Sequence, residues 1–222
     1  MNKTPCSSVP ENWIGARRWP GDKGVTGIDM RNTYTLDGVE YRRHPNGGGW
    51  VPETSGVSPS AFIAFTASVG RGTTVGDGSS VCNRSTVGDG ARLGDWVRLD
   101  HGASVGRGTT LGNRVAVGDG VRLGDWVRLD HGASVGRGTT VGNRVTVGDG
   151  VRICNRVTVG DGASIGEGVA VGDGVRLGNW VTVGDGASIG EGVAVGDGAS
   201  IFANEVVDLS SFELGREGIR AD

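Results

Sequence analysis

Residue types that mark particular functions are scarce in this chain of 222 residues. Lysine occurs only at Lys3 and Lys23, aromatic residues make up 5%, and there are three histidines and three cysteines. With a formal net charge of −3 the chain has no large positive field, so we expect no nucleic-acid partner. The sequence has neither a long apolar run nor an apolar stretch within residues 1–19. We therefore expect a soluble protein made in the cytoplasm, with no membrane partner.

Glycine, by contrast, is abundant, with 44 residues, and it recurs at fixed positions of a repeat. An aliphatic residue stands at every sixth position from Ile63 to Val207, and a small or β-branched residue follows four positions later almost throughout. A period of six is a multiple of the strand period of two and a poor match to 3.6, so it excludes a helix. Such self-similarity predicts a solenoid of stacked rungs.

The hexads Val87–Arg92 and Ile165–Ala170 follow the pattern aliphatic, Gly, any, any, small, any. This pattern resembles the hexapeptide repeat of left-handed parallel β-helix proteins, in which three hexads form one triangular coil of 18 residues. The resemblance implies an all-β fold: a left-handed parallel β-helix of about eight 18-residue coils over residues 63–207. Cys82 and Cys154 replace glycine in the repeat and would lie four coils apart, so we expect both to be free thiols.

The third and fourth residues of each hexad are expected at the corners of the triangle. In one set of hexads the fourth residue is Arg or Trp, and the third is then Asn or Asp. We hypothesise that one residue of each pair has a positive φ, which Gly adopts freely and Asn or Asp tolerates best. These pairs are Asn83-Arg84, Asp95-Trp96, Asn113-Arg114, Asp125-Trp126, Asn143-Arg144, Asn155-Arg156 and Asn179-Trp180.

The chain outside the repeat divides into three further segments. Residues 1–33 are irregular and predict an extended N-terminal arm. Residues 34–62 contain a hairpin signal and a linker, because Asp37-Gly38 separates two strand-like runs and fits a two-residue turn. We expect the hairpin to cap the β-helix, and residues 208–222 to form a short C-terminal cap or tail.

Many proteins of the hexapeptide-repeat family are acyltransferases, in which a His acts as general base and an acyl-carrying cofactor lies in the groove between subunits. That resemblance makes His101 and His131 the catalytic candidates. Both lie in the same segment, which occurs at residues 93–110 and again at 123–140. The two copies are five hexads apart, which is not a multiple of three, so the two His are predicted on different faces. We interpret the copies as structural material and expect no catalytic residue and no cofactor.

Two further observations favour a non-enzymatic role. The hexads run without an insertion, whereas family enzymes often extrude a loop, and the sequence predicts no helical C-terminal domain. A metal site is not expected either. Gamma-class carbonic anhydrases share this fold and bind zinc through three His between subunits, but His44, His101 and His131 include no close pair.

Aromatic residues next to Arg are typical of interface anchors. Together with the habit of the family, they predict a parallel homotrimer around a three-fold axis. The interface candidates are Trp13, Arg17, Arg18, Trp19, Trp96, Trp126 and Trp180.

The sequence therefore predicts a non-enzymatic structural protein, a trimeric β-helix rod that residues 1–62 anchor to a larger protein assembly. A virion is the setting we favour, with the protein on its surface as a capsid decoration, cement or spike protein. Outside a virus we expect it in the cytoplasm. Two alternatives stay open: a hexapeptide-repeat acyltransferase with His101 or His131 as its base, and a self-assembling filament scaffold.

Overall fold

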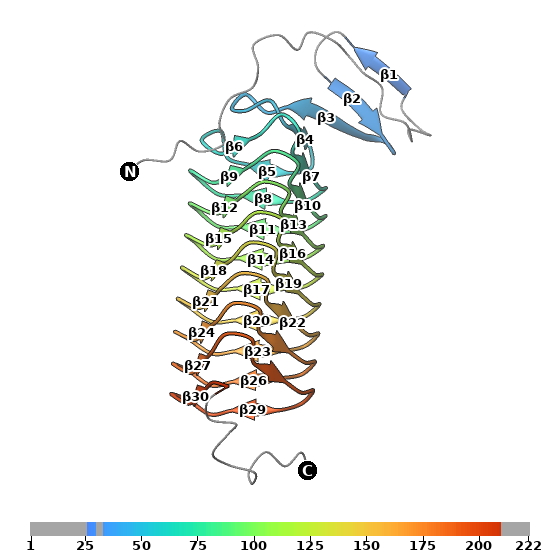
Figure 1. The fold of residues 1–222 in the computed structure, drawn as a ribbon. Helices are drawn as coiled ribbons and strands as arrows, with labels where there is room; N and C mark the ends of the chain where they lie inside the picture. The colour runs from blue at the N-terminus through green and yellow to red at the C-terminus, as the bar shows by residue number, and fades with distance from the viewer. Residues whose placement is uncertain (1–25, 30–32, 210–222) are drawn as a thin grey trace.

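A computed structural model describes residues 26–29 and 33–209 of the chain. These residues form an all-β stack of three-sided coils, and each coil contributes one short strand to each of three sheets (Figure 1). The predicted arm, and with it Trp13, Arg17, Arg18 and Trp19, lies outside the described residues except for one strand. Within the described ranges no helix is long and apolar enough to cross a membrane.

Sheet I has twelve strands and includes the N-terminal hairpin. Its strands are β1 (Thr26–Asp29), β2 (Thr33–Leu36), β3 (Val39–Arg43), β4 (Trp50–Pro52), β7 (Ser68–Val69), β10 (Thr86–Val87), β13 (Ser104–Val105), β16 (Arg122–Leu123), β19 (Thr140–Val141), β22 (Thr158–Val159), β25 (Arg176–Leu177) and β28 (Ala194–Val195).

Sheets II and III have nine strands each, so the stack has about nine coils where eight are predicted. Sheet II contains β5 (Gly56–Val57), β8 (Thr74–Val75), β11 (Arg92–Leu93), β14 (Thr110–Leu111), β17 (Arg128–Leu129), β20 (Thr146–Val147), β23 (Ser164–Ile165), β26 (Thr182–Val183) and β29 (Ser200–Ile201). Sheet III contains β6 (Phe62–Ile63), β9 (Ser80–Val81), β12 (Arg98–Leu99), β15 (Ala116–Val117), β18 (Ser134–Val135), β21 (Arg152–Ile153), β24 (Ala170–Val171), β27 (Ser188–Ile189) and β30 (Val206–Val207).

Parallel pairing between coils holds a constant register of three hexads. Val87 pairs with Val69 on one side and with Val105 on the other, and the same offset recurs in all three sheets. Residues 18 positions apart are therefore neighbours in adjacent coils. This register confirms the predicted coil length.

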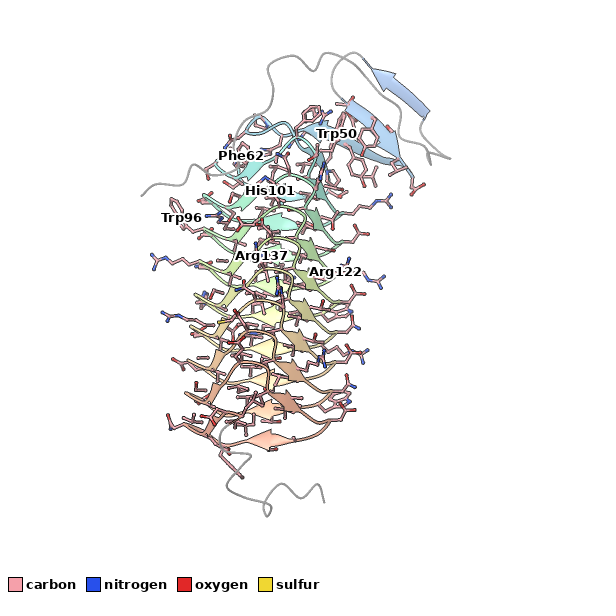
Figure 2. The ribbon with its side chains drawn as sticks, in the orientation of Figure 1. Trp50, Phe62, Trp96, His101, Arg122 and Arg137 are labelled. Carbon is pink, nitrogen blue, oxygen red and sulfur yellow. The ribbon has the colours of Figure 1, made fainter. Side chains whose placement is uncertain are left out.

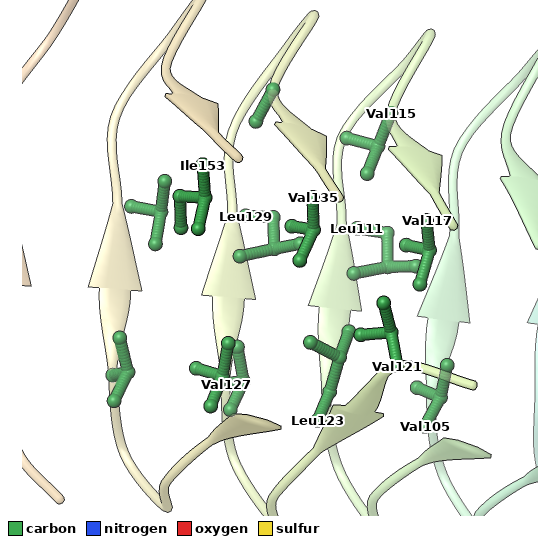
Figure 3. Packing of buried hydrophobic residues seen from close by; sticks show 14 of the residues in the cluster. Val105, Leu111, Val115, Val117, Val121, Leu123, Val127, Leu129, Val135 and Ile153 are labelled. Atoms are coloured by element: carbon green, nitrogen blue, oxygen red, sulfur yellow. The ribbon is translucent and has the colours of Figure 1, made fainter. Parts of the chain in front are cut away.

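The core is a narrow column between the three sheets, filled by the first residue of each hexad. Figure 3 shows Leu111 and Leu129 of sheet II pointing into this column beside Val117 and Val135 of sheet III. The small fifth residues complete the column, and where one is polar its hydroxyl is bonded. Thr109, for example, donates its Oγ1 hydrogen to the carbonyl of Gly124 at 3.0 Å. Every coil is therefore held by burial and by parallel backbone pairing.

Three rows of corners connect the sheets, and in every hexad from the one that begins at Val69 to the one that begins at Ile201 one corner residue has a left-handed backbone. It is the fourth residue of the hexad, so the non-Gly residues concerned include Arg114 and Trp126, with φ of 61° and 60°. The hypothesis that one residue of each pair has positive φ is confirmed. The conformation falls on the Arg or Trp, however, rather than on the Asn or Asp before it.

The Asn or Asp at the third position forms a hydrogen bond to the preceding coil. Its side-chain oxygen accepts the backbone N–H of the third residue in the preceding coil. Arg107 donates in this way to Asp125 at 2.7 Å, and Asp125 donates in turn to Asn143 at 2.9 Å. Each such bond contributes about 0.5–1.5 kcal/mol, which gives a physical reason for the Asp or Asn at the third position of most hexads.

The N-terminal hairpin is present and closes one end of the stack. β2 and β3 pair antiparallel around Asp37-Gly38, and β4 continues into the coils because Trp50 pairs with Ser68. The guanidinium of Arg43 lies between two rings, 3.9 Å from the centroid of Trp50 and 4.1 Å from that of Phe65. Burial there lowers the pKa of Arg43. Coil structure begins earlier than Ile63, because β4 and β5 lie in the segment expected to be a linker.

The two repeat cysteines differ. Cys154 is an exposed free thiol, as expected. Cys82 is disulfide-bonded, so the expectation of a free thiol is wrong for this residue. The four-coil spacing excludes only a bond between Cys82 and Cys154, and Cys154 is the free thiol.

Candidate functional site

The two candidate histidines lie on different corner rows, as their five-hexad spacing predicts. His101 follows β12 and lies on the corner row between sheets III and I, which we call corner III–I. His131 follows β17 and lies between sheets II and III, on corner II–III. Each occupies the third position of its hexad, where most coils have Asp or Asn.

His131 substitutes for one of those Asp or Asn residues. Its Nδ1 accepts the backbone N–H of Asn113 at 2.9 Å, and its own backbone N–H donates to Asp149 at 2.7 Å. Because Nδ1 is an acceptor here, the neutral ring has its hydrogen on Nε2. A general base needs a free lone pair on the outward nitrogen, and this tautomer does not provide one.

His101 has the opposite arrangement. Its backbone N–H donates to Asp119 Oδ1 at 3.0 Å, and its Nδ1 lies 3.8 Å from the same carboxylate oxygen. A carboxylate facing Nδ1 favours the tautomer with hydrogen on Nδ1, which leaves the Nε2 lone pair free. The side chains of His101 and Asp119 are about half exposed, at 53% and 57%, so Nε2 is open to a ligand. Of the two histidines, His101 therefore has the geometry of a general base.

Two guanidinium groups flank His101 along corner III–I. Arg84 lies one coil before it and Arg137 two coils after it, and Figure 2 shows His101 and Arg137 on the surface of the stack. Neither Arg forms an ion pair with any carboxylate of the described residues. Their charge is available to an anionic group such as a phosphate.

The three exposed tryptophans lie on the other two corner rows. Trp96 projects from corner II–III (Figure 2), whereas Trp126 and Trp180 lie on the row between sheets I and II, which we call corner I–II. Their exposed fractions are 66%, 61% and 64%. The indole of Trp126 packs over Gly108 in the preceding coil, where an added Cβ would lie 2.6 Å from the ring. The glycine thus makes room for the ring.

Two shallow depressions accompany these rings. One, of about 610 Å³, is lined by Asp95, Trp96, Asn113, Arg114, His131 and Gly132. The other, of about 420 Å³, is lined by Arg107, Asp125, Trp126, Asn143, Arg144, Asp161, Gly162 and Trp180. The role of these tryptophans as interface anchors stays a prediction.

Within residues 26–29 and 33–209, no group of three or more His, Cys, Asp or Glu side chains is placed to hold a metal ion. His44 is separate from the other two histidines. It lies buried beside the hairpin, and its ring nitrogens lie 3.1 Å from the carbonyl oxygens of Asn46 and Ser58.

The coil length, the three parallel sheets and the corner chemistry define a parallel β-helix of hexapeptide repeats. No protein-family model matches the sequence, and no curated protein sequence matches it. Among solved structures, it is similar to the UDP-N-acetylglucosamine acyltransferase from Campylobacter jejuni. The TM-score is 0.57 at 15% identity, over 64% of this chain and 67% of the other. It is also similar to LpxA from Acinetobacter baumannii, with a TM-score of 0.54 at 21% identity, over 64% of this chain and 65% of the other.

These similarities, with the repeat, show that the chain has the left-handed parallel β-helix fold of hexapeptide-repeat proteins. It spans about two thirds of the length of the two solved proteins. At this level of identity the likeness shows the fold.

The comparisons also correct the functional prediction. The two solved structures named above are acyltransferase structures and contradict the predicted non-enzymatic role and the virion setting, whether capsid decoration, cement or spike, so these predictions are wrong. A capsid partner for residues 1–62 is likewise unsupported. A β-helix without an extruded loop or a helical domain can still bring reactive side chains together. Coil stacking alone brings residues 18 positions apart into contact, so His101 and Asp119 meet without either element.

Proposed function

We propose that the protein is an acyltransferase that moves an acyl group from a thioester carrier to a hydroxyl or amine, with His101 as general base. The observation that carries this proposal is the contact of His101 with Asp119. The acyltransferase activity of solved proteins with the same fold supports it.

In the proposed reaction His101 transfers one proton from the acceptor to the leaving sulfur. Nε2 of His101 removes the proton from the acceptor hydroxyl or amine as its oxygen or nitrogen attacks the thioester carbonyl carbon. The carbon–sulfur bond then breaks, and the leaving sulfur takes the proton from the imidazolium. Asp119 is a positioning residue that holds the ring orientation and stabilises the imidazolium.

The carrier would bind along corner III–I. Acyl carriers such as coenzyme A contain phosphates, and the unpaired guanidinium groups of Arg84 and Arg137 suit phosphate recognition. We expect these two Arg to contribute to carrier affinity and His101 to the rate.

We further propose a parallel homotrimer whose subunit grooves include corner III–I, in keeping with the habit of the family. Sheet II is the face opposite that corner. In such a trimer the tryptophans at the two edges of sheet II would face away from the grooves, which argues against their predicted role as anchors of the trimer.

The test uses two matched variants, His101→Asn and His131→Asn. Asn already occupies the third hexad position in several coils, so His131→Asn keeps the side-chain acceptor of the ladder and His101→Asn places a side chain that this position tolerates. The purified full-length protein is incubated with acetyl-coenzyme A and longer acyl-coenzyme A thioesters, and with a panel of amino- and hydroxyl-bearing sugars. Release of free thiol is followed by its colour reaction with an aromatic disulfide.

We expect His101→Asn to lower kcat by about 10²–10⁴-fold, the usual contribution of a general base, and His131→Asn to leave it unchanged. Arg137→Gln should raise the KM for the thioester with little effect on kcat. Equal losses in both His variants, or no thiol release by the wild type with any donor and acceptor, would overturn the proposal.

A further inference from the structure

Corner I–II carries a pair of exposed aromatic rings that the proposed acyl transfer does not use. Trp126 and Trp180 lie on this row three coils apart, which is about 14 Å at the spacing of strands in a sheet. Each indole has one side against the glycine of the preceding coil, Gly108 or Gly162, and most of the remaining ring surface is exposed. The two rings therefore form separate, flat apolar platforms along one line parallel to the stack.

The surface between the two platforms is polar and balanced in charge. The charged side chains between them that line the depression are the cation Arg144 and the anion Asp161, and the depression extends past Trp126 to the pair Arg107 and Asp125. Arg107 pairs with Asp125 at 3.3 Å, whereas Arg144 forms no ion pair with a described carboxylate. Arg144 also makes no stacking contact with an indole among the described residues. The backbone of Arg144 is left-handed, with φ of 57°. The N–H groups of its guanidinium are available to a ligand.

Acceptors are available beside these donors. The Oδ1 of Asp161 accepts the backbone N–H of Asn143 at 2.6 Å, and the Oδ2 of Asp161 takes part in no described hydrogen bond. The site thus offers both donors and acceptors between two apolar platforms.

This combination fits a neutral sugar better than the other ligands with flat rings. The face of a pyranose ring presents C–H groups, which the negative face of an indole attracts, and its hydroxyls both donate and accept hydrogen bonds. A nucleic-acid strand would also stack on the rings, but its phosphates would meet the carboxylates of Asp125 and Asp161. The charge balance therefore favours an uncharged ligand.

The spacing of the platforms favours a polymer. A single sugar can contact one indole, whereas a chain lying parallel to the stack can contact both and gain from their linkage. We propose that corner I–II is a binding strip for a neutral polysaccharide, with Trp126 and Trp180 as stacking platforms and Arg144 as a hydroxyl-binding group between them. The strip is separate from the His101 corner, so it does not depend on the proposed acyl transfer.

The test measures retardation of the full-length protein in native gels containing a soluble neutral polysaccharide, namely a β-glucan, a xylan, a mannan or a dextran. Heparin and single-stranded DNA serve as polyanion probes. The variants are Trp126→Ala, Trp180→Ala and the double variant. The matched control is Trp96→Ala, which removes an indole of equal exposure from another corner.

We expect retardation by at least one neutral polysaccharide. Each single variant at Trp126 or Trp180 should weaken binding about tenfold or more, and the double variant should abolish it. Trp96→Ala should bind as the wild type does. Trp126→Phe keeps a platform and should retain part of the affinity, and Arg144→Gly, which suits the left-handed backbone, should weaken binding without unfolding the coil.

Several outcomes would overturn the inference. They are no retardation by any neutral polysaccharide, an equal loss in Trp96→Ala, or binding only to heparin or DNA that the tryptophan variants abolish. A change of oligomeric mass in the double variant, measured by light scattering, would instead assign the strip to contact with a second copy of this chain. None of these results bears on His101, whose test is the rate of thiol release.

Discussion

The left-handed backbone at Arg156 leads us to predict that a glycine substitution there stabilises the protein, whereas glycine substitutions usually destabilise. Arg156 has φ of 56°, is exposed, and forms no ion pair with a described carboxylate. An L-residue in this conformation costs about 1–2 kcal/mol relative to glycine. Glycine in turn loses about 0.5–1 kcal/mol because its unfolded chain is more mobile. Arg156→Gly should therefore stabilise the protein by about 0.5–1 kcal/mol.

Arg152 supplies the matched control, because it is an exposed Arg in the same coil but lies in β21. A glycine at a strand position has only the entropic cost, so Arg152→Gly should destabilise the protein by about 0.5–1 kcal/mol. Calorimetry is the assay, and for a domain of this size 1 kcal/mol corresponds to about 2–4 °C in Tm. We expect the two variants to move Tm in opposite directions. A fall in Tm for Arg156→Gly as large as that for Arg152→Gly would refute the reasoning.

Two other changes have effects that follow from packing. Leu129→Ala removes a fully buried side chain from the central column and should lower the free energy of unfolding by about 2–5 kcal/mol, whereas Leu129→Val should cost about 1 kcal/mol; both are measured by denaturation in urea. Arg43→Ala removes the guanidinium between Trp50 and Phe65 and its 2.7 Å hydrogen bond to the Gly48 carbonyl. In a hydrogen-exchange experiment, the opening free energy of the β2–β3 amides should therefore fall by about 2 kcal/mol. The coil amides of β16 and β19 should keep their protection.

The fold could be predicted from the sequence because its signal is local and repeated. An aliphatic residue at every sixth position defines both the strand period and the coil length, and no distant contact is needed to interpret it. The first coil was missed because its residues lack the full hexad pattern. Gly56 and Val57 join sheet II through pairing with Thr74 and Val75, a contact that becomes apparent only when the coils are stacked.

The sequence predicts only part of the structure of the corners. The pairing of Asn or Asp with Arg or Trp is visible in the sequence and correctly indicates a positive φ. Its assignment to the fourth residue, and the hydrogen bond made by the third, depend on which atoms face the preceding coil. Asp125 looks like a turn former in sequence, but in the stack it is the acceptor for Arg107.

The different surroundings of the two histidines could not be predicted from the local sequence. The segments 93–110 and 123–140, which contain His101 and His131, are identical, so the local sequence alone gives both histidines the same chemistry. In the stack their neighbours 18 positions away decide the outcome: the backbone N–H of Asn113 occupies Nδ1 of His131, whereas Asp119 faces Nδ1 of His101. A segment copied out of phase with the coil keeps its sequence and changes its surroundings. The duplication therefore provides two histidines, of which one is already used by the ladder and the other is free to act on a ligand.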